Sequence, residues 1–224
     1  MQSAPEEDLI MASMPPAVVA RLCEYRRQLP GWIADGHDRI FSRELAELIA
    51  TSPAQVRRDL MTFGFTGSPV HGYDAHLLLR TIHEAMGPAP SDTMTLVGVG
   101  HLGHALLNYL ARTRPDLGIP WAFDIDPDLV GQTHGKTTIA HMDQLEEHLQ
   151  DAPPRLGVLA IPRPHAQDCA TRLVRVGVRA LMNFVPVKLE LPDTVHVESV
   201  DIACSLDRAL YFARNEGSVE AGGR

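Results

Sequence analysis

The sequence lacks long apolar runs, cysteine pairs and an excess of positive charge, and each absence excludes a class of protein. The longest apolar run, 156–162, has seven residues, far fewer than the about 20 that span a bilayer. The first residues form neither the basic nor the apolar segment of a secretory signal, so we expect a cytoplasmic protein without membrane association. The three cysteines, Cys23, Cys169 and Cys204, are far apart, which argues against a disulfide framework or a cysteine zinc site.

The overall charge is not that of a general nucleic-acid binder. The 224 residues carry a formal net charge of −8, with 45% hydrophobic and 21% charged residues, the balance of an ordinary globular protein of one or two domains. Non-specific affinity for DNA comes mostly from lysine and arginine. Residues 39–73, however, carry four arginines and three acids, a composition compatible with specific DNA binding and weak non-specific binding.

The first part of the chain shows the spacing of short helices and their end signals. Apolar residues recur on one helical face from Pro16 to Leu29, and we expect Pro30-Gly31 to end that helix. Ser42 and Ser52 are the expected N-caps of two further short helices. Two such helices with only a few residues between them predict a helix-turn-helix.

The second of these helices, Ala54–Phe63, has one apolar and one polar face. Val56, Leu60 and Phe63 share the buried side. The opposite side carries small residues and arginines with a glutamine on its flank, as a helix entering the DNA major groove requires. The alternative is a solvated helix with two ordinary arginines. We expect DNA contacts from Gln55, Arg57, Arg58 and Thr62.

Beyond this helix the pattern changes twice. The glycine-rich stretch 64–72 predicts a tight hairpin or wing, and a helix should follow over 75–86. Gly87–Ser91 breaks every pattern and marks the best domain boundary. Strands and helices then alternate, which predicts an α/β fold with a doubly wound parallel sheet. The expected strands are 94–99, 119–124, 156–161, 180–184 and 195–200, and the expected helices are 101–113, 142–150, 164–176 and 202–214.

The run from Val97 to Gly103 contains G-x-G-x-x-G between an expected strand and an expected helix, the context that gives this short motif its meaning. Gly98 permits the tight turn, Gly100 lets the backbone approach a pyrophosphate, and Gly103 lets helix and strand pack closely. The phosphates would lie on free N–H groups at the helix N-terminus. The run therefore predicts a dinucleotide site.

Asp124 ends the next expected strand, 21 residues after Gly103. A carboxylate at this place accepts a hydrogen bond from a ribose 2′-hydroxyl and would repel a 2′-phosphate, so we expect NAD(H) rather than NADP(H). The alternative is a glycine loop with only a packing role and Asp124 as a turn acceptor. His101, inside the loop, either adds a hydrogen bond to the phosphates or faces solvent at the helix start.

Together these segments resemble the Rex family of redox-sensing transcriptional repressors, from about Val18 to Tyr211. The resemblance rests on several short runs that occur in the family's order. They are Ala54-Gln55-Val56-Arg57-Arg58-Asp59-Leu60 with Phe63-Gly64, the glycine-rich turn, Phe123-Asp124-Ile125-Asp126-Pro127, Ile161-Pro162 with Ala166-Gln167, and Asn183-Phe184-Val185-Pro186-Val187.

The resemblance implies a homodimeric repressor with an N-terminal winged helix, a Rossmann domain and a last helix exchanged between subunits. It implies that NADH releases double-stranded operator DNA, which a two-fold dimer reads as an inverted repeat. The expected segments are a flexible N-terminus 1–14, a winged-helix DNA-binding domain 15–86, a linker 87–93, a Rossmann NAD(H)-binding domain 94–201, an exchanged helix 202–215 and a flexible tail 216–224.

The resemblance also assigns a cofactor site and a switch. The family's paired tyrosine and aspartate correspond to Tyr109 and Asp201, and its arginine at the end of the first helix falls on Arg27. In the expected switch, Asp201 accepts from the partner's Tyr109 in one state and meets Arg27 in the other. The alternative is that Tyr109 is a core residue and Asp201 only caps the last helix. Cofactor contacts are expected from Gly98, Val99, Gly100, His101, Leu102, Gly103, Asp124, Pro162 and Asn183.

The chain departs from the family pattern at three places. The family wing carries an arginine followed by glycine where this chain reads Ser68-Pro69-Val70, so a basic wing contact is missing. Ile202 stands where some members have an aromatic residue that can enter the partner's nicotinamide pocket. His101 replaces a smaller or different polar residue. The wing departure favours one alternative function, an NAD(H)-binding dimer that has lost DNA binding.

A small NAD-dependent dehydrogenase is the other alternative, although we expect no enzyme and no catalytic or metal-binding residue. Residues 94–201 number 108, enough for a nucleotide domain and little more, whereas a dehydrogenase also needs a substrate pocket and a proton donor. His165 is the only tempting general base, and no orienting carboxylate motif accompanies it. Cys169 could report oxidation directly, but no basic group flanks it, so burial without a thiol role is expected.

Overall fold

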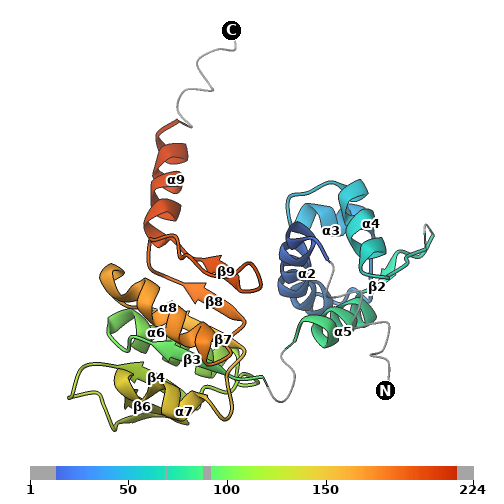
Figure 1. Ribbon diagram of the computed structural model, residues 1–224. Coiled ribbons are helices and arrows are strands. Elements are labelled where there is room, and N and C mark those ends of the chain that lie inside the picture. Colours follow the sequence, from blue (N-terminus) through green and yellow to red (C-terminus); the bar gives the residue numbers. More distant parts are fainter. Residues whose placement is uncertain (1–13, 69, 88–91, 216–224) are drawn as a thin grey trace. The chain divides into compact units, whose positions relative to one another are not determined.

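A computed structural model of the chain describes residues 14–68, 70–87 and 92–215 and divides the chain into two compact units, Met1–Gly87 and Pro88–Arg224 (Figure 1). Most of the expected flexible N-terminus, the expected tail, Pro69 of the wing and 88–91 of the linker lie outside the described residues. The described part of the second unit starts at Asp92, which pairs with Arg155 at 2.6 Å.

The N-terminal unit is a winged helix-turn-helix, as the sequence predicts. Its elements are α2 (Pro16–Ala34), β1 (Arg39–Ile40), α3 (Ser42–Leu48), α4 (Pro53–Thr62), β2 (Tyr73–Asp74) and α5 (Ala75–Met86). Helix α2 packs against α5, and α3 packs against α4. Strands β1 and β2 pair antiparallel, and Ser68 and Gly72 exchange two backbone hydrogen bonds of 3.1 and 2.8 Å in the wing.

The prediction that Pro30-Gly31 ends the first helix is wrong, because α2 continues through Pro30 to Ala34. The fixed φ of proline is helical, so a proline costs its own backbone hydrogen bond and some local strain rather than every following turn. The next turn is held from outside: Trp32 and Ile33 pack against the core of the unit. The indole N–H of Trp32 also donates to the carbonyl of Arg39 at 2.9 Å.

Of the two predicted N-caps, that of α3 is wrong and that of α4 is confirmed. Phe41, not Ser42, precedes α3, and its backbone N–H donates to the Glu44 carboxylate at 2.7 Å. The Ser42 hydroxyl is therefore free to accept from Arg57 at 3.1 Å. Ser52 caps α4 as expected, with its hydroxyl accepting from the N–H of Gln55 at 3.1 Å.

A buried ionic network joins α2 to α4. Asp59 is 0% exposed although it lies on the helix expected to meet DNA. Its carboxylate accepts from Arg21 Nε and Nη2 at 2.6 and 2.7 Å and from the Tyr25 hydroxyl at 2.9 Å. Burial raises the pKa of Asp59, but the hydrogen bonds from Arg21, Gln55 and Tyr25 outweigh it, so its pKa lies below the ordinary value. The aspartate is thus held in its charged form.

The second unit is a doubly wound α/β domain, which confirms the expected fold class. Its strands are β3 (Met94–Val97), β4 (Trp121–Asp124), β5 (Thr133–His134), β6 (Thr137–His141), β7 (Leu156–Leu159), β8 (Ala180–Asn183) and β9 (His196–Ser199). They form a sheet in the order β5-β6-β4-β3-β7-β8-β9, and only β5 pairs antiparallel. The order reverses direction at β3, as in dinucleotide-binding folds.

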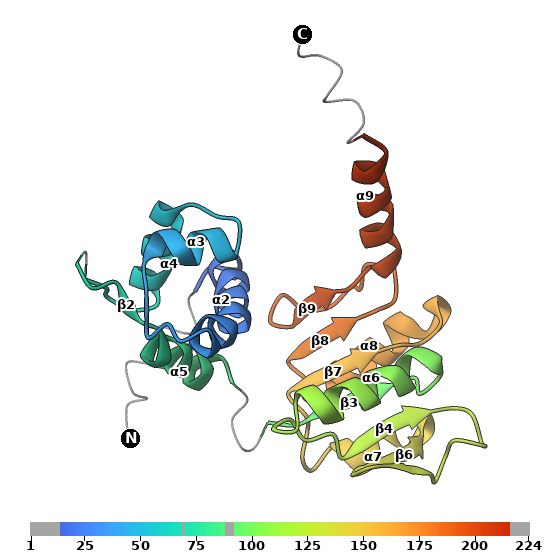
Figure 2. The same cartoon turned by 180° about the vertical axis from the view of Figure 1, so that it is seen from behind.

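Helices cover both faces of this sheet. They are α6 (His101–Thr113), α7 (Leu145–Leu149) and α8 (Ala166–Arg175). Helix α6 lies on one face and α7 and α8 on the other, as Figures 1 and 2 show from opposite sides. Because successive strand residues point to opposite faces, Val97 joins the core with Leu173 of α8, whereas Leu96 joins the core with Leu107 of α6. Both faces are therefore buried.

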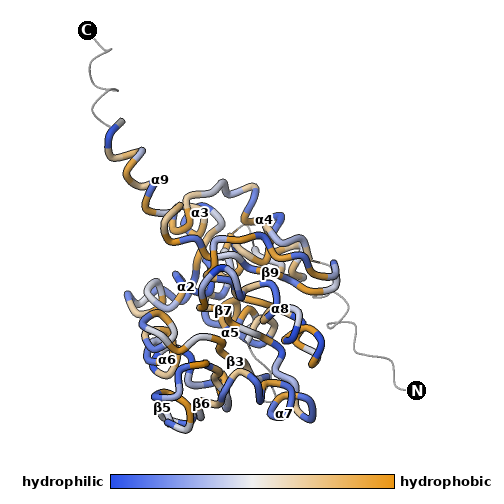
Figure 3. The backbone as a smooth tube through the Cα atoms, turned by 60° about the vertical axis from the view of Figure 1, so that its left-hand side comes forward, coloured by the Kyte–Doolittle hydropathy of each residue, from blue (hydrophilic) through white to orange (hydrophobic). Residues whose placement is uncertain are grey.

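The hairpin of β5 and β6 was absent from the sequence-based expectation, and the last helix lies open to solvent in the part of the chain that the structure describes. Helix α9 (Ile202–Asn215) is exposed at every residue from Ile202 to Arg214. Figure 3 shows hydrophobic segments along it. Its large apolar side chains are between 52% and 64% exposed, namely Ile202, Leu206, Leu210, Tyr211 and Phe212. Among the described residues, no helix is both long enough and apolar enough to cross a membrane.

Removing the buried carboxylate should destabilise the N-terminal unit. We expect Asp59→Ala to lower its free energy of unfolding by about 3 kcal/mol, the lower end for a broken buried pair, because Arg21 is 26% exposed and regains some water. Urea unfolding followed by tryptophan fluorescence in a Trp121→Phe background would measure this, since Trp32 then reports on this unit alone.

The exposed pair of Arg27 with Glu24 supplies the control, and Glu24→Ala should cost no more than about 0.5 kcal/mol. The pKa of Asp59 is lowered in the folded state, so its contribution is present above the unfolded pKa of about 4. That contribution is lost as the pH falls through the folded value. Equal stability of Asp59→Ala and the parent at neutral pH would contradict the role of the network.

Candidate functional site

The glycine-rich turn lies where the sheet order reverses. Strand β3 ends at Val97, α6 begins at His101, and β4 and β7 flank β3 on its two sides. In open α/β sheets the crevice at this point, beyond the carboxyl ends of the strands, is where ligands bind. The backbone N–H groups at the start of α6 face the same end of the sheet, where they favour an anion.

The three glycines have different surroundings. Gly98 has a φ of +93°, and a Cβ there would lie 2.4 Å from the Ala160 carbonyl oxygen. A Cβ on Gly103 would lie 2.0 Å from the carbonyl oxygen of Gly98. Gly100 differs, because a Cβ there would meet no atom within 4 Å. Gly98 and Gly103 are thus required by the protein's own packing, whereas Gly100 leaves open space where a ligand can approach the backbone.

Asp124 is tied to the turn. Its Oδ2 accepts from the backbone N–H of Val99 at 2.6 Å, and its Oδ1 accepts from the N–H groups of Ile125 and Asp126 at 2.7 and 3.0 Å. An ionised carboxylate offers about four lone-pair sites, so one position remains for a ribose hydroxyl. Asp124 is therefore a turn acceptor, as the alternative states. This role is compatible with a hydrogen bond to the cofactor ribose.

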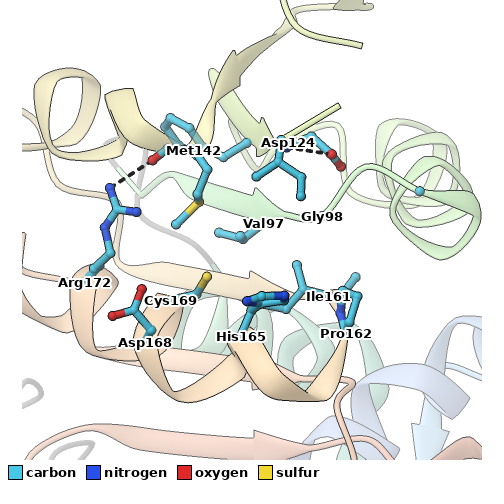
Figure 4. Close-up of a pocket in the computed structure, with 14 residues that line it drawn as sticks. Val97, Gly98, Asp124, Met142, Ile161, Pro162, His165, Asp168, Cys169 and Arg172 are labelled. Carbon is cyan, nitrogen blue, oxygen red and sulfur yellow. Dashed lines mark hydrogen bonds between the residues drawn. The ribbon is translucent and has the colours of Figure 1, made fainter. Parts of the chain in front are cut away.

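A pocket of about 370 Å³ opens between the ends of β3, β4 and β7. In Figure 4, the Cys169 sulfur and the Met142 side chain point toward the pocket, with Val97 between them and Ile161 on the opposite wall from Asp124. Its size and apolar walls suit a flat heterocycle. The lining residues are Val97, Gly98, Gly100, Phe123, Asp124, Ile125, Met142, Ala160, Ile161, Pro162, His165, Asp168, Cys169 and Arg172.

Several of these lining residues were not predicted from the sequence. Met142, Asp168 and Arg172 were not expected at the site. Met142 follows β6, which was missed as a strand, while Asp168 and Arg172 lie on α8 one turn apart. The signal that could have found them is positional, since residues just past the carboxyl end of each parallel strand, and those on the helix that follows, gather at one edge of the sheet.

Arg172 lines the pocket and donates hydrogen bonds to two neighbouring residues. Its Nε and Nη2 donate to the two oxygens of Glu146 at 2.7 and 2.6 Å, and Nη2 also donates to the Met142 carbonyl at 2.9 Å. This fork holds α8 against α7. The hydrogen bonds from Arg172 lower the pKa of Glu146 and raise that of Arg172, so the pair stays ionised.

Two pocket residues bear on the alternatives raised by the sequence. Cys169 is 7% exposed, and burial raises the pKa of its thiol. A protonated thiol is a poor nucleophile, which disfavours direct oxidation sensing. His165 is exposed and ends a short 3-10 turn beside the pocket. No cluster of metal-binding side chains occurs within residues 14–68, 70–87 and 92–215.

The remaining expected cofactor residues take different positions. His101 and Leu102 are exposed in the first turn of α6, and Pro162 is exposed at the rim of the pocket. Asn183 is 1% exposed and uses its amide internally. Its Nδ2 donates to the Val187 carbonyl at 3.1 Å and its Oδ1 accepts from Val185 N–H at 3.0 Å. Asn183 therefore shapes the loop after β8, and a cofactor contact from it stays a prediction.

The expected DNA-contacting residues lie on α4 as a linked set. Arg57 and Arg58 are exposed, and Arg57 Nη1 donates to the Ser42 hydroxyl at 3.1 Å. Arg58 Nη2 donates to Gln55 Oε1 at 2.6 Å, and the Thr62 hydroxyl donates to the Arg58 carbonyl at 2.9 Å. Contact of these side chains with DNA stays a prediction, with a solvated helix carrying two ordinary arginines as its alternative.

The expected switch residues are all exposed. Arg27 pairs with Glu24 on α2. Tyr109 is 62% exposed on α6, so the alternative that it is a core residue is wrong. Asp201 Oδ1 accepts from the N–H of Cys204 at 2.8 Å and so caps α9. That cap leaves the other carboxylate oxygen for a further donor.

Comparison with known proteins finds relatives along nearly the whole chain. Residues 13–60 match the family model described as a putative DNA-binding protein N-terminus, and residues 91–187 match the model described as a CoA binding domain. The redox-sensing transcriptional repressor Rex of Anoxybacillus flavithermus is 35% identical over 205 residues, which cover 92% of this chain and 96% of that protein.

Solved structures give the same result. RSP, a Rex-family repressor, has been crystallised with β-NAD+ and operator DNA, and that structure matches this chain with a TM-score of 0.83 at 32% identity. The match covers 92% of this chain and 95% of that one. The complex of RSP with β-NADH matches with a TM-score of 0.82 at 32% identity, covering 92% and 96%.

The glycine geometry predicts two different defects. Gly100→Ala should fold normally, because its Cβ meets open space, but the added methyl group should block the approach of phosphate to the backbone and abolish NADH binding. Gly103→Ala should instead lower stability, because its Cβ would collide with the Gly98 carbonyl. Thermal unfolding and an NADH fluorescence titration would separate the two. Tight NADH binding by a folded Gly100→Ala variant would remove the pyrophosphate from this turn.

Proposed function

The chain belongs to the Rex family of redox-sensing transcriptional repressors, and we propose that it is a DNA-binding repressor that senses the NADH/NAD ratio, with NADH releasing the operator. The observation that carries this proposal is the similarity, over 92% of the chain, to a repressor crystallised with β-NADH and with β-NAD+ and operator DNA. An arginine-bearing helix in the N-terminal unit and a dinucleotide pocket in the second unit support it.

The cofactor of this proposal is NAD(H), bound across the end of the sheet. The pyrophosphate lies on the N–H groups at the start of α6 beside Gly100, and the adenine fills the apolar pocket. Asp124 accepts from the ribose 2′-hydroxyl, which disfavours a 2′-phosphate. The residues assigned to this site are Gly98, Val99, Gly100, His101, Leu102, Gly103, Asp124, Pro162 and Asn183.

The second partner is double-stranded operator DNA. The side of helix α4 that carries Arg57, Arg58 and Thr62 enters the major groove. Gln55, next to Arg58, belongs to the same group of proposed DNA-binding residues. The net charge of −8 predicts that binding depends on specific contacts more than on general attraction to phosphate. We place the protein in the cytoplasm, where it would act on operator DNA.

The third element is a homodimer that reads an inverted repeat. The exposed apolar residues of α9 support it, because Ile202, Leu206, Leu210 and Phe212 leave a large apolar area in water. Exchange of α9 between subunits would bury that area and place Asp201, at the start of α9, near the partner subunit. The proposed switch then has Asp201 accept from the partner's Tyr109 or meet Arg27.

The two other functions are less well supported. The similar proteins are named as transcriptional repressors, so the family is regulatory and not enzymatic, and a dehydrogenase is disfavoured. Loss of DNA binding is suggested only by the wing sequence Ser68-Pro69-Val70. The arginines on α4 and their ordered hydrogen bonds argue for retained binding.

The function is tested by selecting DNA from a random pool and then titrating the selected duplex. A ligand shifts an equilibrium only by its differential affinity for the two states, so NADH should weaken DNA binding well beyond NAD+ at equal concentration. Fluorescence anisotropy of the labelled duplex would measure both. Equal effects of the two cofactors, or no selected sequence, would contradict the proposal.

Tyr109→Phe tests the switch, because it removes the hydroxyl and keeps the ring. Since Tyr109 is 62% exposed, the unfolding temperature and NADH affinity should stay near those of the parent. The ratio of operator affinities without and with NADH should fall, because Asp201 loses one of its two donors. A parental ratio in Tyr109→Phe would show that this hydroxyl plays no part.

A further inference from the structure

A chain of hydrogen bonds runs along α4 from its buried side to its exposed side. Gln55 Nε2 donates to Asp59 Oδ1 at 2.7 Å, and Gln55 Oε1 accepts from Arg58 Nη2 at 2.6 Å. Residues three and four positions apart in a helix are neighbours on its surface, so all three side chains meet on one flank. The exposed guanidinium is thereby connected to a fully buried carboxylate.

The buried end of this series of hydrogen bonds is fixed. Asp59 and Tyr25 are each 0% exposed. Besides Gln55, the Asp59 carboxylate holds two hydrogen bonds from Arg21 and one from Tyr25, at 2.6 to 2.9 Å. These four bonds use the roughly four lone-pair sites that a carboxylate offers. The carboxylate cannot rotate without losing several of these bonds, so it fixes the position of the Gln55 amide.

The direction of the Gln55 amide follows from its two partners. A carboxylate only accepts and a guanidinium only donates, so Nε2 must face Asp59 and Oε1 must face Arg58. A reversed amide would set two acceptors and two donors against each other. In a bidentate contact with adenine, both amide atoms point at the base. Here both are directed at side chains, which disfavours Gln55 as a direct reader of sequence.

We propose that Gln55 is a positioning residue that transmits the fixed place of Asp59 to Arg58, and so sets how Arg58 meets DNA. The inference rests on the proposed DNA-binding function. A long arginine side chain loses rotamer freedom when it binds, and one that is already held loses less. Arg57 offers the contrast, because its guanidinium bonds to Ser42 of α3 and not to Gln55.

The test is a pair of double-mutant cycles on the selected operator duplex. Gln55→Met keeps side-chain length and helix propensity but removes both hydrogen bonds. We expect Gln55→Met to weaken binding about tenfold in the parent and to have almost no effect in an Arg58→Ala background, because coupled residues give non-additive losses. In an Arg57→Ala background, the same substitution should again weaken binding about tenfold, since independent sites add.

Two further measurements, base preference and unfolding temperature, separate a positioning role of Gln55 from a purely structural one. Selection with Gln55→Met should flatten the preference only at the base pairs that Arg58→Ala also flattens. Its unfolding temperature should fall slightly, because the buried Asp59 loses one of its four hydrogen bonds. If Arg58 meets a phosphate instead, both variants should lower the salt slope by the same amount.

Three results would overturn the inference alone: equal losses from Gln55→Met with and without Arg58, a base preference lost only in Gln55→Met, or parental affinity in Arg58→Ala. Either of the first two would show that Gln55 contacts DNA itself or acts independently. Absence of any selected DNA sequence for the parent protein would instead overturn the proposed function, and this inference with it.

Discussion

The cofactor-binding unit depends on the close approach of α6 to the end of β3. A side chain on Gly103 would overlap the carbonyl of Gly98, so the helix can start this near the strand only with glycine there. That contact fixes the N-terminus of α6 and its free N–H groups beside the pocket. Asp124 then fastens the turn from the neighbouring strand through Val99. The same helix presents Tyr109 about two turns on, so a contact of two backbone segments sets both the anion site and a proposed switch residue.

In the N-terminal unit the comparable constraint is electrostatic. Asp59 carries its charge in the interior and is stabilised by Arg21 and Tyr25 from α2. A buried ion pair often adds little net stability compared with an apolar core. Its geometry is specific, however, because the guanidinium and the phenol leave the carboxylate a single orientation. The network thus ties Asp59 of α4 to two residues of α2 in a defined geometry.

Local sequence signals predicted much of this fold, and long-range pairing accounts for what they missed. Helices 75–86 and 101–113 have the expected limits, since α5 begins at the Asp74 cap and α6 at the glycine-rich turn. The β5–β6 hairpin was missed because 133–141 is polar and short-stranded, and sheet pairing outweighs such weak propensity. The glycine turn and Asp124 were recognisable from spacing. The role of Gln55 was not, because its partner Asp59 is fixed by Arg21, which lies 38 residues away in the chain.

Helix α2 links the residue of the proposed signal, Arg27, to the helix of the proposed DNA contact, α4. Arg21 and Tyr25 hold Asp59 on one side of it, and Arg27 lies exposed two residues beyond Tyr25. A helix held by its i to i−4 hydrogen bonds moves as a unit over so short a distance. In the proposed switch, a change at Arg27 would therefore act on α2 as a whole. Because Asp59 joins α2 to α4, and Gln55 joins Asp59 to Arg58, such a movement would reach the DNA-facing arginine through bonds of defined geometry rather than through loose packing.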